Sequence, residues 1–166
     1  MRRLIIFALL IFTLGGFQSK RSDFSGSWKL DLEKSVDLPA TFKNVEAYSM
    51  DVRQTADSMV VVVGLSGSGQ SVKFPPTMYA FDTSEVYRED TLRGSKRWSK
   101  CAWETTGKKM IVTSKVRQKK ASGELVYTQK DVWQLNDLKT MQIVITQSFA
   151  KGDSVHSERR IFHLVM

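Results

Sequence analysis

Phe-Ser-Gly-Ser-Trp-Lys-Leu-Asp-Leu, from Phe24 to Leu32, is the stretch that decides the fold of this chain. Its apolar residues Trp28, Leu30 and Leu32 alternate with polar ones, which is the period of a β-strand with one buried and one wet face. An apolar leader precedes the stretch, and short alternating segments without a long helical pattern follow it. A strand anchored by an aromatic residue that opens such a series is typical of a closed β-barrel.

The leader has the pattern of a secretory signal peptide. Two arginines precede an apolar run from Leu4 to Leu14. The run is about 11 residues long, too short to span a bilayer core of about 30 Å as a helix. Small and polar residues follow it, so we expect cleavage between Gly16 and Lys20. The sequence therefore predicts a signal peptide at 1–19, one domain at 20–166 and a secreted or periplasmic protein, with an uncleaved N-terminal anchor as the alternative.

The composition fits one domain with a sizeable core. The chain has 166 residues, a formal net charge of +8 and a single cysteine, Cys101. No intrachain disulfide can form, so stability must come from packing and from a hydrogen-bonded sheet even in an oxidising compartment. Because Cys101 lies in a predicted strand, we expect a buried, unreactive thiol.

The positive charge is concentrated at Lys115, Arg117, Lys119 and Lys120. The first three share one face of a predicted strand, as expected of the solvated outer side of a barrel wall. A nucleic-acid footprint would need aromatic residues interleaved on that face, and the strand carries none there. We therefore expect no nucleic-acid partner, while a weak attraction to anionic surfaces such as lipid headgroups or polysaccharide stays open.

Alternation and turn residues divide the chain into eight to ten strands. The predicted strands are about 26–32, 48–55, 59–65, 72–74, 78–81, 96–104, 109–118, 124–135, 140–149 and 156–165. Residues 85–92 receive no assignment, 33–44 are predicted to be a connecting loop with a helical turn, and 64–69 a mobile hairpin tip. Short links with turn residues predict antiparallel neighbours.

An open sheet of this length would leave long edges and an apolar face in water, with no helices to cover them. Closing the sheet on itself removes both problems. The sequence therefore predicts an all-β chain that forms a single up-and-down antiparallel β-barrel of eight to ten strands. A two-sheet sandwich is the alternative, because it accepts the same alternation.

Three short motifs carry a resemblance to a known family. They are Gly26-x-Trp28 followed by Leu30 and Glu33-Lys34-Ser35, then Asp131-Val132-Trp133-Gln134-Leu135, and last Arg159-Arg160-Ile161-Phe162. In type and spacing they resemble small secreted bacterial lipocalin-like domains, of the calycin group that includes lipocalins and fatty-acid-binding proteins. The disulfides common in secreted lipocalins are missing, as is a clear helix-turn-helix lid. The resemblance implies a lipocalin-like barrel that binds a ligand such as a lipid.

The resemblance also implies roles for individual residues. Trp28 would close the base of the barrel, and Arg159 or Arg160 from the last strand would pack over its indole. Fatty-acid-binding relatives hold a ligand carboxylate with an Arg-x-Tyr pair on the last strand. Here the arginine of Arg160-Ile161-Phe162 is kept, but Phe162 replaces the hydroxyl.

The position of Arg160 is informative without the resemblance. It alternates with Phe162 and should face inward, where a guanidinium needs an acceptor. The inward candidates are Asp131, Gln129 and Gln147. We favour Asp131, which would make the pair structural; otherwise an anion from the ligand would complete the site.

Catalytic and metal-binding patterns are missing from the sequence. His156 and His163 are not spaced as metal ligands, no Gly-x-Ser-x-Gly motif is present, and Cys101 has no evident histidine partner. We therefore expect no metal, no cofactor and no enzymatic activity. An enzyme that uses interior carboxylates is the weakest alternative.

The predicted function is binding of a small hydrophobic or amphiphilic ligand inside the barrel of an exported monomer. The residues expected to line the ligand site are Tyr48, Met50, Val52, Tyr127, Ile143, Ile145, Arg160 and Phe162. The alternative is a filled core in a secreted protein-interaction or surface-binding module, with 115–120 and 64–69 as contact surfaces. An interior cavity above about 300 Å³ would favour the first reading.

Overall fold

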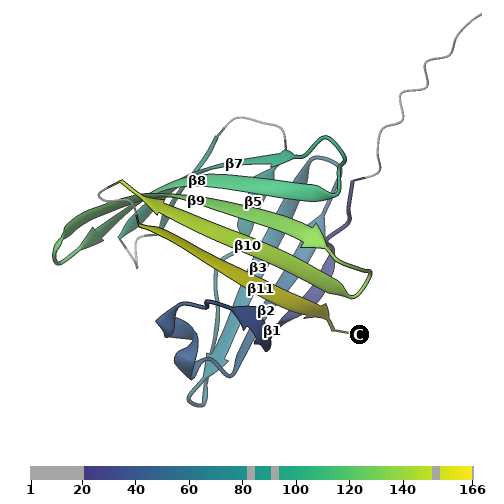
Figure 1. The fold of residues 1–166 in the computed structure, drawn as a ribbon, viewed down its shortest axis with the longest axis horizontal. Helices are drawn as coiled ribbons and strands as arrows, with labels where there is room; N and C mark the ends of the chain where they lie inside the picture. The colour runs from purple at the N-terminus through teal and green to yellow at the C-terminus, as the bar shows by residue number, and fades with distance from the viewer. Residues whose placement is uncertain (1–20, 82–84, 91–93, 151–153, 166) are drawn as a thin grey trace, which may run out of the picture.

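The computed structural model describes residues 21–81, 85–90, 94–150 and 154–165, which form one antiparallel sheet and a short 3-10 helix (Figure 1). The predicted signal peptide lies outside the described residues. The elements are β1 Gly26–Val36, η1 Ala40–Asn44, β2 Ala47–Gln54, β3 Ser58–Gly67, β4 Gln70–Lys73, β5 Thr77–Ala80, β6 Val86–Asp90, β7 Ser95–Trp103, β8 Lys109–Lys120, β9 Gly123–Leu135, β10 Thr140–Phe149 and β11 Val155–Leu164. Within these ranges, no helix has the length and apolar character that a bilayer span requires.

The topology is a meander whose first and last strands meet. The hydrogen-bonded order is β4-β3-β2-β1-β11-β10-β9-β8-β7-β6, and β5 also pairs with β3. β4 and β5 occupy successive parts of the same edge of β3, separated by Pro75 and Pro76. Proline has no N–H to donate to a ladder, so the two prolines explain the interruption. The all-β, up-and-down antiparallel prediction is confirmed.

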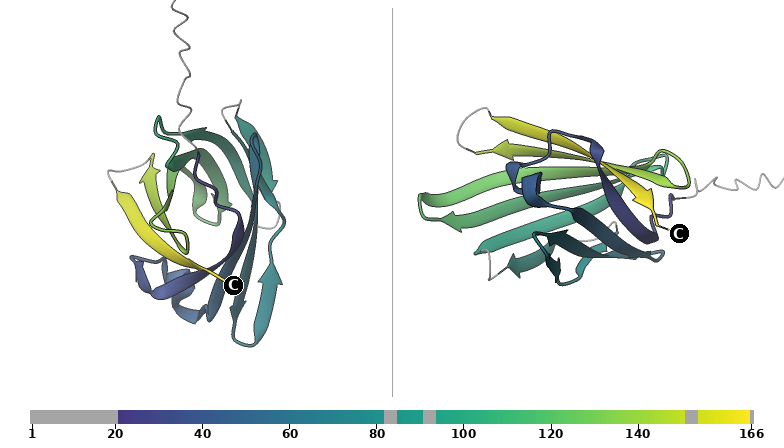
Figure 2. Two further views of the ribbon diagram at one scale, coloured as in Figure 1. Left: turned by 90° about the vertical axis from the view of Figure 1, so that its right-hand side faces the viewer. Right: turned by 90° about the horizontal axis from the view of Figure 1, so that it is seen from below.

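The two ends of the sheet come together between β5 and β7. Phe81, directly after β5, forms an isolated parallel bridge with Cys101 of β7. Nearby, Arg88 of β6 donates to the Thr77 hydroxyl of β5. The strands thereby curl around one interior, as the end-on view in Figure 2 shows. This is one continuous sheet, not the two stacked sheets of the sandwich alternative.

Burial follows the period of two that the sequence predicts. On β8, Val112 and Val116 are buried whereas Lys115, Arg117 and Lys119 are exposed. The same alternation in the other long strands places one apolar side of each inside. Cys101 is buried, as expected.

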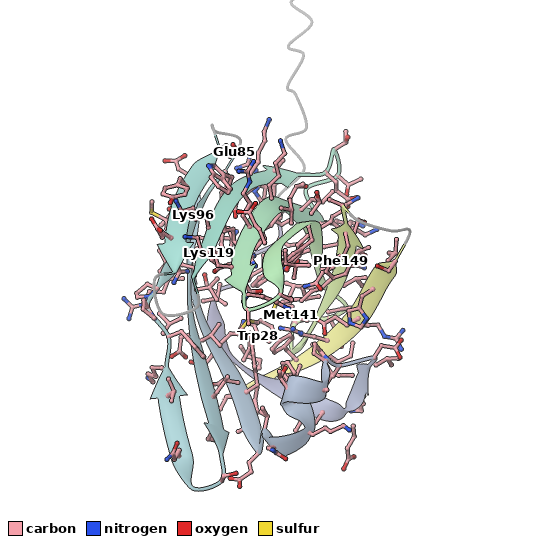
Figure 3. All side chains as sticks on the ribbon, turned by 90° about the vertical axis from the view of Figure 1, so that its left-hand side faces the viewer. Trp28, Glu85, Lys96, Lys119, Met141 and Phe149 are labelled. Carbon is pink, nitrogen blue, oxygen red and sulfur yellow. The ribbon has the colours of Figure 1, made fainter. Side chains whose placement is uncertain are left out.

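An aromatic cluster fills one end of the barrel. Trp28 is only 2% exposed, and its indole N–H donates to the Phe24 carbonyl at 2.9 Å. Phe24 stacks on Trp103 at 5.8 Å between ring centroids and meets Trp133 edge-on at 6.0 Å. Figure 3 shows Trp28 and Met141 inside the ring of strands. The chain that precedes β1 therefore contributes to the plug together with the strand-borne tryptophan.

The segment after β1 differs in detail from the expected loop. β1 continues to Val36 through an irregularity in its register with β11, and η1 supplies the expected helical turn. The end of η1 packs tightly on β3, because a Cβ placed on Gly67 would lie 2.2 Å from the Asn44 carbonyl oxygen. At the hairpin tip predicted for 64–69, Ser68 and Gly69 both have positive φ, the geometry of a tight two-residue turn.

Candidate functional site

A cavity of about 690 Å³ lies inside the barrel. Apolar side chains of β2, β3, β8, β9 and β10, together with residues around η1 and Pro75, form part of its lining. The apolar lining residues include Pro39, Phe42, Val45, Met50, Val61, Val63, Leu65, Phe74, Pro75, Val116, Trp133, Ile143 and Ile145. This volume is in the range of small-molecule sites, which begin near about 300 Å³.

Most residues that the sequence assigned to the ligand site do line this cavity. They are Tyr48, Met50, Tyr127, Ile143, Ile145 and Arg160. Val52 and Phe162 do not, and for them the assignment to the lining is wrong. Both are buried in the packed core, where Phe162 is in register with Leu30 and Met141. The alternation correctly predicts that both side chains point inward. It cannot predict whether an inward side chain lies in the packed core or lines the cavity.

Arg160 has a different partner from the one expected. Its Nη2 contacts Oε1 of Glu158 at 2.6 Å, so the counter-charge comes from the same strand and not from Asp131. Inward residues two apart on a strand share a face, which makes the pairing a local consequence of the sequence. The second oxygen of Glu158, Oε2, and Nε of Arg160 are buried and have no hydrogen-bond partner among the residues described.

The guanidinium of Arg160 lies over two aromatic rings of the lining. Its carbon is 5.0 Å from the ring centroid of Phe42 and 5.6 Å from that of Tyr48. The role implied by the resemblance, an arginine packed over Trp28, is therefore not what Arg160 does. Arg159 is exposed on the outer face of β11 and does not cover the Trp28 indole, which is buried on the inner side.

A chain of amide hydrogen bonds crosses the polar wall of the cavity. Gln147 donates to Oε1 of Gln129 at 3.1 Å, and Gln129 donates to both oxygens of Asp131 at 2.8 and 3.2 Å. Arg97 reaches the same Gln129 oxygen at 3.5 Å. The buried Asp131 is thus held by a neutral amide.

Burial dominates the electrostatics of this wall. It raises the pKa of the Asp131 carboxyl above its ordinary value, although the hydrogen bond from Gln129 and the charges of Arg97 and Arg160 act in the opposite direction. Burial likewise raises the pKa of the Tyr48 and Tyr79 hydroxyls, so both are neutral hydrogen-bonding groups. The interior combines neutral tyrosines and amides with a small number of charged groups.

Several polar lining residues were missed by the sequence reading. They are Glu158, Arg97, Arg88, Tyr79 and Gln118. The Glu-x-Arg spacing of 158 and 160 was a usable signal, because it places opposite charges on one face of a strand. Arg97 also had a signal, because it shares a face with Cys101 in the predicted strand 96–104. Arg88 had none, since residues 85–92 showed no clear pattern and its register depends on the hairpin between β6 and β7.

The outer surface of β6–β9 also differs from the sequence interpretation. Trp98 of β7 is in register with Lys115, and its ring lies 5.3 Å from Tyr87 and 5.8 Å from the guanidinium of Arg117. Counting only residues of one strand therefore overlooked aromatic neighbours supplied by adjacent strands. The basic face and these two rings form one surface.

No metal site is evident in the part of the chain that the structure describes, where no three His, Cys, Asp or Glu side chains gather closely enough to hold an ion. The two carboxylates of the cavity, Asp131 and Glu158, are each held by a residue of their own strand, Gln129 and Arg160.

Comparison with known proteins supports the fold. No family model and no curated protein sequence matches the chain. Among solved structures, it is similar to the REP1-NXSQ fatty acid transporter, with a TM-score of 0.53 and 17% identity over 86% of this chain and 96% of the other. It is also similar to a Schistosoma mansoni fatty acid binding protein in complex with arachidonic acid, with a TM-score of 0.50 and 15% identity over the same shares. At these identities the likeness shows the fold alone: this chain has an up-and-down antiparallel β-barrel similar to that of the fatty-acid-binding proteins.

Proposed function

We propose that this protein is an exported carrier that binds a small hydrophobic or amphiphilic molecule inside its barrel. The observation that carries the proposal is the interior cavity of about 690 Å³. A core with no ligand to hold would gain stability by filling such a space, because empty apolar volume costs packing energy. The fold shared with fatty acid carriers supports the same conclusion.

The lining suits a molecule with an apolar body. Val61, Val63 and Leu65 of β3 offer apolar surface, and Ile143 and Ile145 of β10 add to it. Burial of ligand surface contributes roughly 25 cal/mol per Å² before the entropic costs of association. A few polar groups of the lining would orient the ligand by hydrogen bonds.

The direct test is native mass spectrometry of the purified protein, followed by titration with a fluorescent fatty-acid probe. We expect a co-purified small molecule, or saturable binding of the probe that added amphiphiles reverse. A Val63→Phe substitution fills part of the cavity and should weaken binding at least tenfold. Val62→Phe, at the neighbouring position on the opposite face of β3, is the matched control and should bind as the wild type does. Binding equal in both variants, or no saturable binding by the wild type, would contradict an interior site.

Export is a separate part of the proposal, supported by the leader at residues 1–19. Expression of the full chain in a secreting bacterial host should release a product that has lost about the first 19 residues. Intact-mass measurement of the released protein checks this. A product that retains the leader and stays with the membrane fraction would support the anchored alternative.

A second candidate function is binding to an anionic surface by the outer face of β6–β9. The favouring observation is the Trp98 ring between Tyr87 and Arg117, beside Lys115. Amphipathic aromatic rings and basic residues are the groups found at lipid headgroups. Sedimentation with vesicles of anionic phospholipid should be lost in Lys115→Glu/Arg117→Glu and kept in Lys29→Glu/Arg53→Glu, whose charges lie on the outer face of β1–β2. Equal sedimentation of both variants would argue against this surface.

A further inference from the structure

Two arginines face each other across the hairpin of β6 and β7. Arg88 and Arg97 are direct register partners, and both line the interior cavity. Like charges placed directly opposite on neighbouring strands destabilise a sheet. A chain that keeps two guanidiniums in this position gives up some stability unless something anionic lies between them.

The contacts of these two arginines are with neutral oxygens. Arg88 donates to the Thr77 hydroxyl and to the Pro75 carbonyl, the latter at 3.5 Å. Arg97 has one long contact, 3.5 Å from its Nη2 to the Gln129 side-chain oxygen. Neither forms an ion pair within the described ranges of the chain.

Neither acidic residue of the cavity forms an ion pair with Arg88 or Arg97, although Asp131 lies near enough for the charge of Arg97 to lower its pKa. Glu158 is engaged by Arg160 at 2.6 Å, and Asp131 accepts both of its hydrogen bonds from the Gln129 amide. The lining as a whole contains three arginines and two acidic residues, so it carries one positive charge in excess. The excess belongs to the pair on β6 and β7, because the third arginine already has its partner.

We propose that Arg88 and Arg97 form an oxyanion-binding site that holds the anionic head group of the ligand. The proposal rests on the interior site described under Proposed function, and it names the class of ligand as an amphiphile that ends in a carboxylate or a phosphate. A guanidinium offers parallel N–H donors that match both groups. The apolar tail would then extend toward Tyr48 and Ile143.

This assignment differs from the one that the last strand suggests. Arg160 is the arginine that sequence reasoning offered as the anchor, yet its charge is compensated by Glu158 and its face is covered by Phe42 and Tyr48. A second anion brought to Arg160 would meet the Glu158 carboxylate. Arg160 therefore positions the apolar lining, and the head group binds elsewhere.

The test compares three probes with the same tail: oleic acid, oleyl alcohol and 1-oleoyl lysophosphatidic acid. Each is titrated into the mature wild-type protein and into Arg97→Gln, Arg88→Gln and Arg159→Gln, with circular dichroism to confirm folding. We expect the wild type to prefer the two anionic probes over the alcohol at least tenfold. Arg97→Gln should remove that preference and change alcohol binding less than twofold. Arg159→Gln, which removes a positive charge from the exposed outer face of β11, is the matched control and should keep the preference.

The anionic probe that responds more strongly to Arg97→Gln identifies the head group as carboxylate or phosphate. Because Arg88 also joins β6 to β5, its variant tests folding as well as binding. If Arg88→Gln does not fold, the result for Arg97→Gln alone decides the test. Equal binding of acid and alcohol by the wild type, an equal loss of all three probes in Arg97→Gln, or loss of the preference in Arg159→Gln would each overturn the site. Failure of the wild type to bind any of the three probes would overturn the carrier function itself and the site with it.

Discussion

Glu158 and Arg160 enter the barrel interior side by side from β11, joined by a contact of 2.6 Å between Oε1 and Nη2. Their side chains are 3% and 16% exposed, so the pair is largely withdrawn from water. A buried ion pair adds little net stability when it is compared with a well-packed apolar pair, but removal of one partner leaves an uncompensated charge. Glu158 therefore compensates the charge of Arg160, which allows the guanidinium to lie in the barrel interior.

The first prediction concerns this pair. Glu158→Ala should lower the free energy of unfolding by about 3 kcal/mol, because Arg160 is left buried without its counter-charge. Glu158→Gln keeps an acceptor oxygen for Nη2 and should lose less. Urea denaturation of both variants measures the difference. A loss below about 1 kcal/mol in Glu158→Ala would mean that the Arg160 charge is compensated by another group.

The second prediction concerns the plug at the closed end. Trp28→Ala should cost about 3–5 kcal/mol, since a fully buried indole leaves a cavity and the Phe24 carbonyl loses its donor. Trp98→Ala on the outer face is the control, for which we expect a loss below about 1 kcal/mol. Thermal and urea unfolding of the two variants check the contrast. Similar losses would show that Trp28 does not seal the barrel.

The third prediction uses the sign of the Asp131 shift. Burial raises the pKa of Asp131 in the folded protein above its ordinary value of 3.8, so folding favours the protonated carboxyl. The stability linked to this group is greatest below pH 3.8 and falls as the pH rises through the folded pKa. Asp131→Asn should therefore raise the free energy of unfolding at pH 7 by on the order of 1 kcal/mol, because a neutral amide is cheaper to bury.

The same variant has an internal control in pH. Below about pH 3.8, where the wild-type carboxyl is protonated in both states, Asp131→Asn and the wild type should unfold at nearly the same urea concentration. A variant that is less stable than the wild type at pH 7 would show that the ionised carboxylate is favourably held by its surroundings.

The fourth prediction has the opposite sign. The Asp31 carboxylate accepts the backbone N–H groups of Glu33 and Lys34 and lies 2.9 Å from Nε2 of His163. The hydrogen bond from the Lys34 backbone is the main cause of its low pKa, about 2 against an ordinary value of 3.8. Its contribution to stability is complete above pH 3.8 and is lost as the pH falls through about 2.

Asp31→Asn should accordingly be less stable than the wild type at pH 7, with the gap closing between pH 3.8 and 2. Urea midpoints measured across that interval provide the check. A difference in stability that does not change with pH would mean that Asp31 stabilises the fold by its hydrogen bonds and not by its negative charge.

Much of the wall could be predicted because alternation is a local property. The strands of the second half follow the predicted ranges closely, since each buries one face and ends at turn residues such as Gly107 and Asn136. The inward direction of Tyr48, Ile143 and Arg160 follows from the same period. The interruption at Pro75 was visible because proline cannot donate to a ladder.

The rest depends on pairing between strands. β6 was missed because its polar residues, including Arg88, are paired across a hairpin and do not alternate with apolar ones. The boundary between the packed core and the cavity lies between Phe162 and Arg160. Side chains from the opposite wall of the barrel determine its position. Arg160 pairs with Glu158, two residues away on its own strand, and not with Asp131, which lies on β9 with β10 between them.

The weak pairing between β5 and β7 determines where the barrel wall can open. Along the described strands, neighbours in the meander are joined by ladders of several residues, whereas β5 and β7 share the single bridge from Phe81 to Cys101. Separating two neighbouring strands elsewhere breaks many backbone hydrogen bonds. Separating β5 from β7 breaks one bridge, together with the hydrogen bond from Arg88 to Thr77. The opening through the barrel wall that breaks the fewest hydrogen bonds therefore lies between β5 and β7, beside the guanidinium of Arg88.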